Sequence, residues 1–418
     1  MNDRAVLDLL LAHGPLSRTR TGQLTGLSKP TVSQLLSRLE AAGLVVATGT
    51  TEGGPGPGAR LYAVNARAAY AAGLDVTPRR ILAAVADLTG TVVGEYELLT
   101  PERRADSAVR QVTRALDGAV RAAGLAHADL RRVVIGTPGA FDPATGQLRY
   151  AAHLPGWHSA ALLDELTAAL PVPVEYENDV NLAAVAERRL GAARGKQDFV
   201  LLWNEQGLGA ALFIGGQLHR GFTGGAGEVG FLPVPGTALV RKAARANSGG
   251  FQELAGAPSV PRLARALGID VPEQHPERPH AEAAARLLAR AAAGHTGAGH
   301  SGRTDDERAG RTDAGRADDE HAQDGRFAEL LRLYAQRLAT GLASVTAVLD
   351  PELIVLTGGV TAAGGEPLRA LVERELAELA ASRPRLVLGE VQRRPVLRGA
   401  LESALATTRD EVFDTSSR

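Results

Sequence analysis

The chain has 418 residues, a formal net charge of −1 at pH 7 and no cysteine. This length exceeds what one hydrophobic core usually serves, and the missing cysteines exclude disulfides and thiolate metal sites. The near-zero charge excludes a general attraction to nucleic acid, so a DNA-binding surface would have to be local. We find neither a signal peptide nor a bilayer-spanning stretch, and we expect a cytoplasmic protein without membrane contact.

Residues 1–65 are predicted to form a winged helix-turn-helix. A first helix ends at Gly14-Pro15, and a second spans residues 17–25. Ser28 is positioned to cap a third helix. This helix buries apolar residues at i, i+3, i+4 and i+7 spacing, namely Val32, Leu35, Leu36 and Leu39. Strands at 44–47 and 60–64, joined by a Gly/Pro loop at 53–58, complete a hairpin of the kind that forms a wing.

The outward face of the third helix is predicted to contact DNA. It carries Thr31, Gln34, Ser37 and Arg38, with Lys29 at its flank, and the second helix of such a motif enters the major groove. Arg18 is expected to hold the DNA backbone. Arg60 follows the Gly/Pro loop, which is narrow enough to enter a minor groove. The alternative is an ordinary three-helix unit with a solvated polar face. The tight glycine turn, the small polar face and the glycine-rich wing tip together favour DNA. Because one helix supplies few contacts, we expect a homodimer or homotetramer on a two-fold operator.

From residue 66 onward, strand-like and helical runs alternate, which predicts an α/β fold in two lobes, 66–185 and 186–406. Residues 294–325 contain few large apolar side chains, so we expect a disordered insertion. We interpret the histidines of this insertion as part of a solvated loop, although histidine clusters also bind metals. Residues 407–418 are likewise expected to be a disordered tail.

Several strings together resemble the ROK family (repressors, open reading frames, kinases). They are residues 31–45 of the third helix, Gly136-Thr137-Pro138-Gly139, Leu154-Pro155-Gly156-Trp157, Glu177-Asn178-Asp179-Val180-Asn181, Gly227-Glu228-Val229-Gly230 and Leu356-Thr357-Gly358-Gly359-Val360. The resemblance implies a winged helix-turn-helix followed by a two-lobed, actin-like (ribonuclease H-like) sugar-kinase fold with a cleft between the lobes. Some members phosphorylate sugars, and others repress transcription, often of sugar genes.

The same resemblance implies a sugar site. Asp179 matches the catalytic base of the kinases, Asn178 matches a neighbour that holds a sugar hydroxyl, and Glu228 and Glu253 match two sugar-binding carboxylates. We add Gly139, from the string Gly136-Thr137-Pro138-Gly139, to this predicted effector site. The alternative is that these residues are inherited scaffold, with Asp179 capping a helix that begins near Asn181.

The phosphate loops depart from the family pattern. The first loop has Pro78 where the family has a second glycine, and proline has no N–H to donate. The second loop has Glu205 where the family has glycine, and a carboxylate repels nucleotide phosphates. We therefore expect no catalytic residue and no cofactor. Many relatives hold zinc with one histidine and three cysteines; Phe231 takes the histidine position here, so we predict no metal and consider a stacking role for Phe231.

These observations predict a DNA-binding transcriptional regulator, a repressor in our interpretation, with operator DNA and a sugar or phosphosugar effector as partners. One rival is an ATP-dependent sugar kinase with an accessory DNA-binding head. Another is a DNA-binding or architectural protein that responds to no ligand.

Overall fold

The computed structural model describes residues 2–51, 58–100, 107–142, 145, 147–149, 154, 157, 159, 161–240, 249–271, 280–297 and 311–414. They form two compact units. The first contains the described residues up to Phe141, residues 145–182 and those from Val396 onward; the second contains Asp142 and the described residues of 183–395. Within the described ranges, no helix combines the length and the apolar character that crossing a membrane requires.

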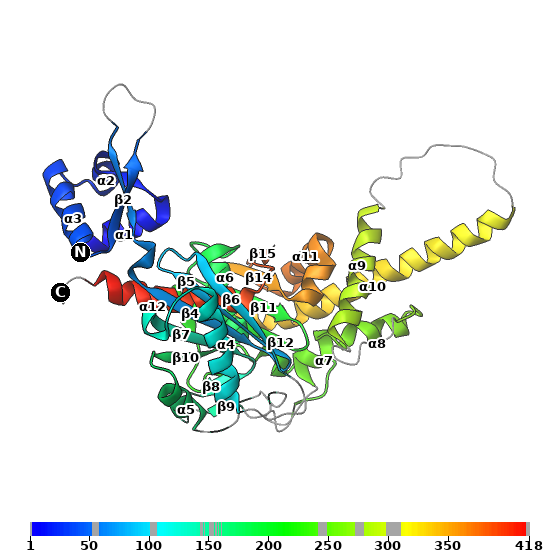
Figure 1. Ribbon diagram of the computed structural model, residues 1–418. Coiled ribbons are helices and arrows are strands. Elements are labelled where there is room, and N and C mark those ends of the chain that lie inside the picture. Colours follow the sequence, from blue (N-terminus) through cyan, green and yellow to red (C-terminus); the bar gives the residue numbers. More distant parts are fainter. Residues whose placement is uncertain are drawn as a thin grey trace. The chain divides into compact units, whose positions relative to one another are not determined.

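The winged helix-turn-helix is present as predicted (Figure 1). Ser17 and Ser28 cap its second and third helices, since their hydroxyls accept hydrogen bonds from the N–H of Arg20 and Thr31. The strands form a sheet in the order β1-β3-β2, of which the short β1 was not predicted. The elements are α1 (Asn2–His13), β1 (Leu16–Ser17), α2 (Arg18–Thr25), α3 (Lys29–Ala41), β2 (Val45–Thr50) and β3 (Arg60–Val64). The tip of the expected wing loop, residues 52–57, lies outside the described residues.

The rest of the first unit is a five-stranded sheet in the order β10-β7-β4-β5-β6. Helices α4 and α5 cover it with a core of aliphatic residues and Trp157. The elements are η1 (Ala66–Ala68), β4 (Tyr70–Val76), β5 (Arg80–Asp87), β6 (Val92–Leu99), α4 (Ala108–Ala122), η2 (His127–Asp129), β7 (Leu130–Thr137), β8 (Ala140–Asp142), β9 (Gln147–Arg149), α5 (Leu162–Ala169) and β10 (Val174–Asn178). The next helix, α6 (Asp179–Leu190), begins in the first unit and belongs to the second from Ala183 onward.

The second unit repeats this topology. Its sheet has the order β13-β12-β11-β14-β15, and in both sheets three antiparallel strands are followed by two parallel ones. The repeat confirms a two-lobed α/β fold. The elements are β11 (Phe199–Asn204), β12 (Leu208–Ile214), β13 (Gln217–His219), η3 (Val229–Phe231), α7 (Gly250–Ala255), α8 (Ser259–Ala266), α9 (Ala281–Gly297), α10 (Arg311–Leu349), β14 (Leu353–Thr357), α11 (Gly359–Leu379) and β15 (Arg385–Leu388).

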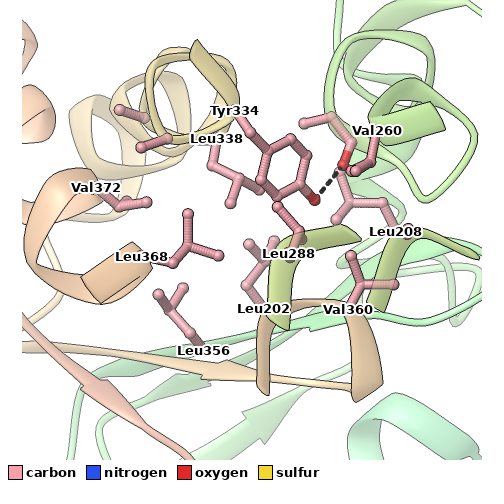
Figure 2. Packing of buried hydrophobic residues seen from close by; sticks show 14 of the residues in the cluster. Leu202, Leu208, Val260, Leu288, Tyr334, Leu338, Leu356, Val360, Leu368 and Val372 are labelled. Carbon is pink, nitrogen blue, oxygen red and sulfur yellow. Dashed lines mark hydrogen bonds between the residues drawn. The ribbon is translucent and has the colours of Figure 1, made fainter. Parts of the chain in front are cut away.

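The core of the second unit lies between its sheet and its helices. Figure 2 shows Leu202 and Leu356 of the sheet facing Leu338 of α10 and Leu368 of α11. All four side chains are buried. Aliphatic residues dominate this core, as the low aromatic content of the sequence requires.

The final helix, α12 (Pro395–Phe413), belongs to the first unit from Val396 onward. Two expectations are therefore wrong: the second lobe does not extend to 406, and residues 407–413 are helical. The helix persists because Val412 and Phe413 are buried in the core of the winged helix-turn-helix. α12 also passes α6 so closely that a Cβ atom at Gly399 would lie 1.8 Å from the carbonyl oxygen of Leu182. Residues 415–418 lie outside the described residues.

The expectation of a disordered insertion at 294–325 is also wrong where the structure describes it. Residues 294–297 end α9, and residues 311–325 begin α10, which Figure 1 draws as one long helix. The segment mixes good helix formers, such as alanine and arginine, with aspartate and glycine, so helix propensity alone does not explain its structure. It continues a helix whose later turns are buried. Residues 298–310, the remainder of the expected insertion, lie outside the described residues.

Candidate DNA interface and effector site

Helix α3 separates a buried stripe from an exposed polar face. Val32, Leu35, Leu36 and Leu39 are buried in the core of the winged helix-turn-helix. The seven predicted DNA-contacting residues are all exposed, namely Arg18, Lys29, Thr31, Gln34, Ser37, Arg38 and Arg60. Five of them lie on α3, so the fold presents them together on one helix, as base reading requires.

Two of these arginines already hold acidic partners within the protein. Arg38 forms an ion pair with Asp3 of α1, and the Nη2 atom of Arg60 lies 2.9 Å from Oε1 of Glu40. Arg38 is still largely exposed, with 62% of its side chain accessible. A guanine or phosphate must therefore compete with Asp3 for Arg38. Gln34 also lies on this exposed face of α3, where it is accessible to a base edge.

In the first unit, the predicted effector residues Gly139 and Asn178 are in direct contact. The amide of Asn178 donates from Nδ2 to the carbonyl oxygen of Gly139, at 3.0 Å. Its Oδ1 accepts from the N–H of Val180 and Asn181, at 2.9 and 3.1 Å. Asn178 thus caps the first turn of α6, and Oδ1 of Asp179 also accepts from the N–H of Val180, at 2.8 Å. The expected start of this helix near Asn181 is wrong. The helix begins at Asp179 itself.

A buried carboxylate supports this turn. Glu177 is only 9% exposed, and its Oε1 accepts from the N–H of Asn178 and from Nδ2 of Asn181, both at 2.8 Å. The position of Asp179 at the start of α6 is therefore set by hydrogen bonds on both sides. Asp179 remains half-buried, so it is held by the protein and still accessible to a solute.

In the second unit, Glu228 directly precedes the short helix η3, Phe231 is the last residue of η3, and Glu253 lies on α7. The N–H of Phe231 donates to the carbonyl oxygen of Glu228. Burial raises the pKa of the Glu228 carboxyl above its ordinary value. All three side chains are half-buried. The six predicted effector residues are thus divided equally between the two units.

A buried polar cluster fixes the end of α7, the helix that carries Glu253. The hydroxyl of Tyr334 donates to the carbonyl oxygen of Ala255 at 2.9 Å, and Nδ2 of Asn204 donates to both oxygens. Tyr334 is labelled in Figure 2, with its hydrogen bond dashed. Burial raises the pKa of Tyr334, so its hydroxyl stays protonated and able to donate. Sequence reasoning missed this cluster because its members are distant in the chain.

We expect Tyr334→Phe to lower the free energy of unfolding by ~1–2 kcal/mol, because the carbonyl of Ala255 and the amide of Asn204 lose a buried partner. Chemical unfolding of the purified protein measures this. Tyr96→Phe is the control, because the Tyr96 side chain is exposed and removing its hydroxyl should leave the free energy of unfolding nearly unchanged. Equal stability of the two variants would contradict the role of the cluster.

The two altered phosphate loops have defined local structures. Thr77–Arg80 forms a closed turn in which the Thr77 hydroxyl bonds the carbonyl of Arg80, and the carbonyl of Pro78 accepts from Thr100. In the second unit, Oε1 of Glu205 accepts from the N–H of Gly359 at 2.6 Å. Gly359 is the first residue of α11. Backbone amides at the start of a helix often bind phosphate, and here the Glu205 carboxylate already accepts the hydrogen bond from one of them.

No group of three or more acidic or histidine side chains within the described part of the chain is arranged to hold a metal ion. The prediction of no metal stays a prediction for the whole chain.

Two parts of the sequence match models of known protein families. Residues 71–258 match the model described as ROK family, and residues 2–46 match the model described as winged helix-turn-helix DNA-binding. Residues 71–258 therefore form a ROK family domain, which the winged helix-turn-helix precedes in the chain. The predicted ROK resemblance is therefore confirmed, and with it the fold class.

The curated relatives of this chain include both repressors and kinases. The xylose repressor of Bacillus subtilis is 26% identical over 238 residues, which cover 56% of this chain and 60% of the repressor. The glucokinase of Halalkalibacterium halodurans is 29% identical over 163 residues, 39% of this chain and 49% of the kinase. The match thus spans about 60% of the length of the repressors, and names alone do not separate the two activities.

Two solved structures share the fold. A ROK hexokinase from Thermus thermophilus superposes with a TM-score of 0.62 at 25% identity, over 82% of this chain and 99% of the hexokinase. A ROK family transcriptional regulator, a homologue of the Escherichia coli MLC protein, superposes with a TM-score of 0.70 at 19% identity. That comparison covers 99% of this chain and 97% of the regulator, so it includes the winged helix-turn-helix of residues 1–65, hereafter the head.

Proposed function

We propose that this protein is a sequence-specific DNA-binding transcriptional regulator, acting as a repressor, whose affinity for its operator is set by a sugar or sugar-derived effector. The observation that carries the proposal is the exposed polar face of α3, opposite a fully buried leucine stripe, in a winged helix-turn-helix joined to a ROK body. The similarity to xylose repressors over 56% of the chain supports it.

The proposed effector residues are Gly139, Asn178 and Asp179 in the first unit and Glu228, Phe231 and Glu253 in the second. Carboxylates and an amide suit a polyhydroxylated ligand, because each hydroxyl can donate to one oxygen and accept from another group. Phe231 would stack on the apolar face of a sugar ring. Because Asn178 already uses its Oδ1 as a helix cap, it can offer a sugar only its remaining amide hydrogen.

The effector test is DNA binding by fluorescence anisotropy, with DNA from upstream of the protein's own reading frame and a panel of pentoses, hexoses and phosphosugars. At least one sugar should change the operator affinity, and linkage requires operator DNA to change sugar affinity by the same factor. Asp179→Asn should abolish the sugar effect while leaving the affinity of sugar-free protein unchanged. If a sugar binds measurably but leaves operator affinity unchanged, the coupling is wrong.

We also propose that the protein does not transfer phosphate from ATP. Phosphoryl transfer needs backbone donors and a metal-bound nucleotide. Pro78 lacks a donor, and Glu205 presents a carboxylate that already binds the amide of Gly359. A coupled assay of ATP consumption over hexoses separates this view from its rival, a kinase with an accessory DNA-binding head. Turnover that disappears in Asp179→Asn would overturn our proposal.

A homodimer or homotetramer is part of the proposal, because two recognition helices on a two-fold site give the contacts that one cannot. Analytical ultracentrifugation with and without operator measures the state. A monomer that binds one half-site with full affinity would contradict it.

We expect Gln34→Ala to reduce the preference for operator over unrelated DNA by ~1–3 kcal/mol, because glutamine can form a bidentate contact with adenine. Anisotropy titrations with both DNAs, at one salt concentration, measure the preference. Gln23→Ala on α2 is the matched control, since it removes an exposed glutamine outside the reading helix. An unchanged preference in the Gln34 variant would mean that another residue reads the bases.

A further inference from the structure

Tyr62 is a buried tyrosine in the sheet of the winged helix-turn-helix, and it is not one of the residues predicted to contact DNA. It lies on the central strand β3, paired with Leu16 of β1 and Ala47 of β2, and its side chain is fully buried. A buried tyrosine hydroxyl needs a partner. Its partner is Arg18: Nη2 of the guanidinium donates to the hydroxyl oxygen at 2.5 Å.

Two exposed arginines meet at this one ring. The Cζ atoms of Arg18 and Arg60 each lie 5.3 Å from the ring centroid of Tyr62, within the range of cation–π attraction. The two guanidinium groups therefore lie within twice that distance of each other. Arg18 is the first residue of α2, and Arg60 is the first residue of β3. The ring thus joins the motif's second helix to its wing.

The partners of the two arginines differ in charge. Arg60 is paired with the carboxylate of Glu40, whereas the hydroxyl that holds Arg18 is neutral. A neutral acceptor orients a guanidinium without cancelling its positive charge. Arg18 therefore keeps its positive charge next to Arg60 and beside an exposed reading helix, and this charge favours an anion such as a backbone phosphate of duplex DNA.

We propose that Tyr62 is a positioning residue for DNA: it holds Arg18 and Arg60 as a pair that contacts backbone phosphates next to the groove entered by α3. The proposal rests on the proposed function, since it presumes that the head binds DNA. It adds a buried residue that touches no DNA and sets the affinity for every sequence.

The test is Tyr62→Phe, which keeps the ring and removes the hydroxyl. Affinity for operator and for unrelated duplex should fall by the same factor, about 3- to 10-fold, and the slope of log affinity against log salt should shrink by up to about one. Arg18→Ala should match or exceed this loss, and the double variant should bind no worse than Arg18→Ala alone. Arg67→Ala, an exposed arginine of η1 without these contacts, should keep the slope of the unaltered protein.

The outcomes separate the two proposals. If Tyr62→Phe binds and responds to salt like the unaltered protein, or if its loss adds fully to that of Arg18→Ala, the positioning role is wrong while DNA binding stands. If the unaltered protein binds no duplex, the proposed function fails. If Tyr62→Phe does not fold, Arg18→Lys decides: it keeps the charge without the planar guanidinium, so unchanged affinity would overturn the proposal.

Discussion

Phe413→Ala should lower the free energy of unfolding of the first unit by ~3–5 kcal/mol, the usual cost of removing a buried phenylalanine. Phe413 is 2% exposed and lies in the core of the winged helix-turn-helix, although it is in the last turn of α12. The guanidinium of Arg4 lies 5.4 Å from its ring centroid and also pairs with Asp410 at 2.7 Å. Because the same core holds α3, the variant should lose DNA affinity along with stability. Thermal unfolding and anisotropy measure both.

Phe222→Ala is the matched control for this experiment. Its side chain is 91% exposed, so the same substitution should leave stability and DNA affinity nearly unchanged. A Phe413 variant as stable as the Phe222 variant would mean that α12 does not contribute to the core of the head.

Gly399→Ala should destabilise the first unit by about 3 kcal/mol or more, because overpacking against backbone cannot be relieved by a side-chain rotation. A Cβ atom there would lie 1.8 Å from the carbonyl oxygen of Leu182 in α6. Since α6 begins at Asp179, the forced separation of α6 and α12 should also weaken the proposed effector response. Chemical unfolding and sugar titration measure the two effects.

Gly294→Ala controls for the change of residue type. Gly294 also lies in a helix, and nothing stands within 4 Å of a Cβ atom built on it. Alanine there should raise stability by up to ~1 kcal/mol through helix propensity. If both variants are equally stable, α6 and α12 do not meet as closely as the structure has them.

The head was predictable because its signals are local. Ser17 and Ser28 lie within three residues of the amides they cap, and the buried stripe of α3 is a simple 3.6-residue period. The pairing of Arg18 with Tyr62 was not predictable, because the two are 44 residues apart and only the folded wing brings them together.

The two segments that were wrongly expected to be disordered are helices that depend on contacts with distant parts of the chain. Residues 407–413 have a weak apolar pattern alone, and they become helical because Val412 and Phe413 complete a core made by the first residues of the chain. Residues 311–325 were expected to be disordered for lack of apolar side chains, a criterion that ignores helix continuation from a buried segment. The role of Asn178 as a helix cap was missed because Asn178 and Asp179 are adjacent and both residue types are common helix caps.

The effector site could be predicted only by family resemblance. Its members come from four separate parts of the chain, and no spacing rule joins Asn178 to Glu253. What the structure adds is local: a buried carboxylate, Glu177, beneath the turn that carries Asp179, and the polar cluster beneath α7.

The position of Val412 and Phe413 also affects how the protein is made. The helices of the head are synthesised before α12, so part of their core follows on the order of tens of seconds later. Until then, the apolar surface that these two residues cover stays open. A nascent chain should therefore carry an incomplete DNA-binding head, and tight operator binding should be acquired only when translation of α12 is finished.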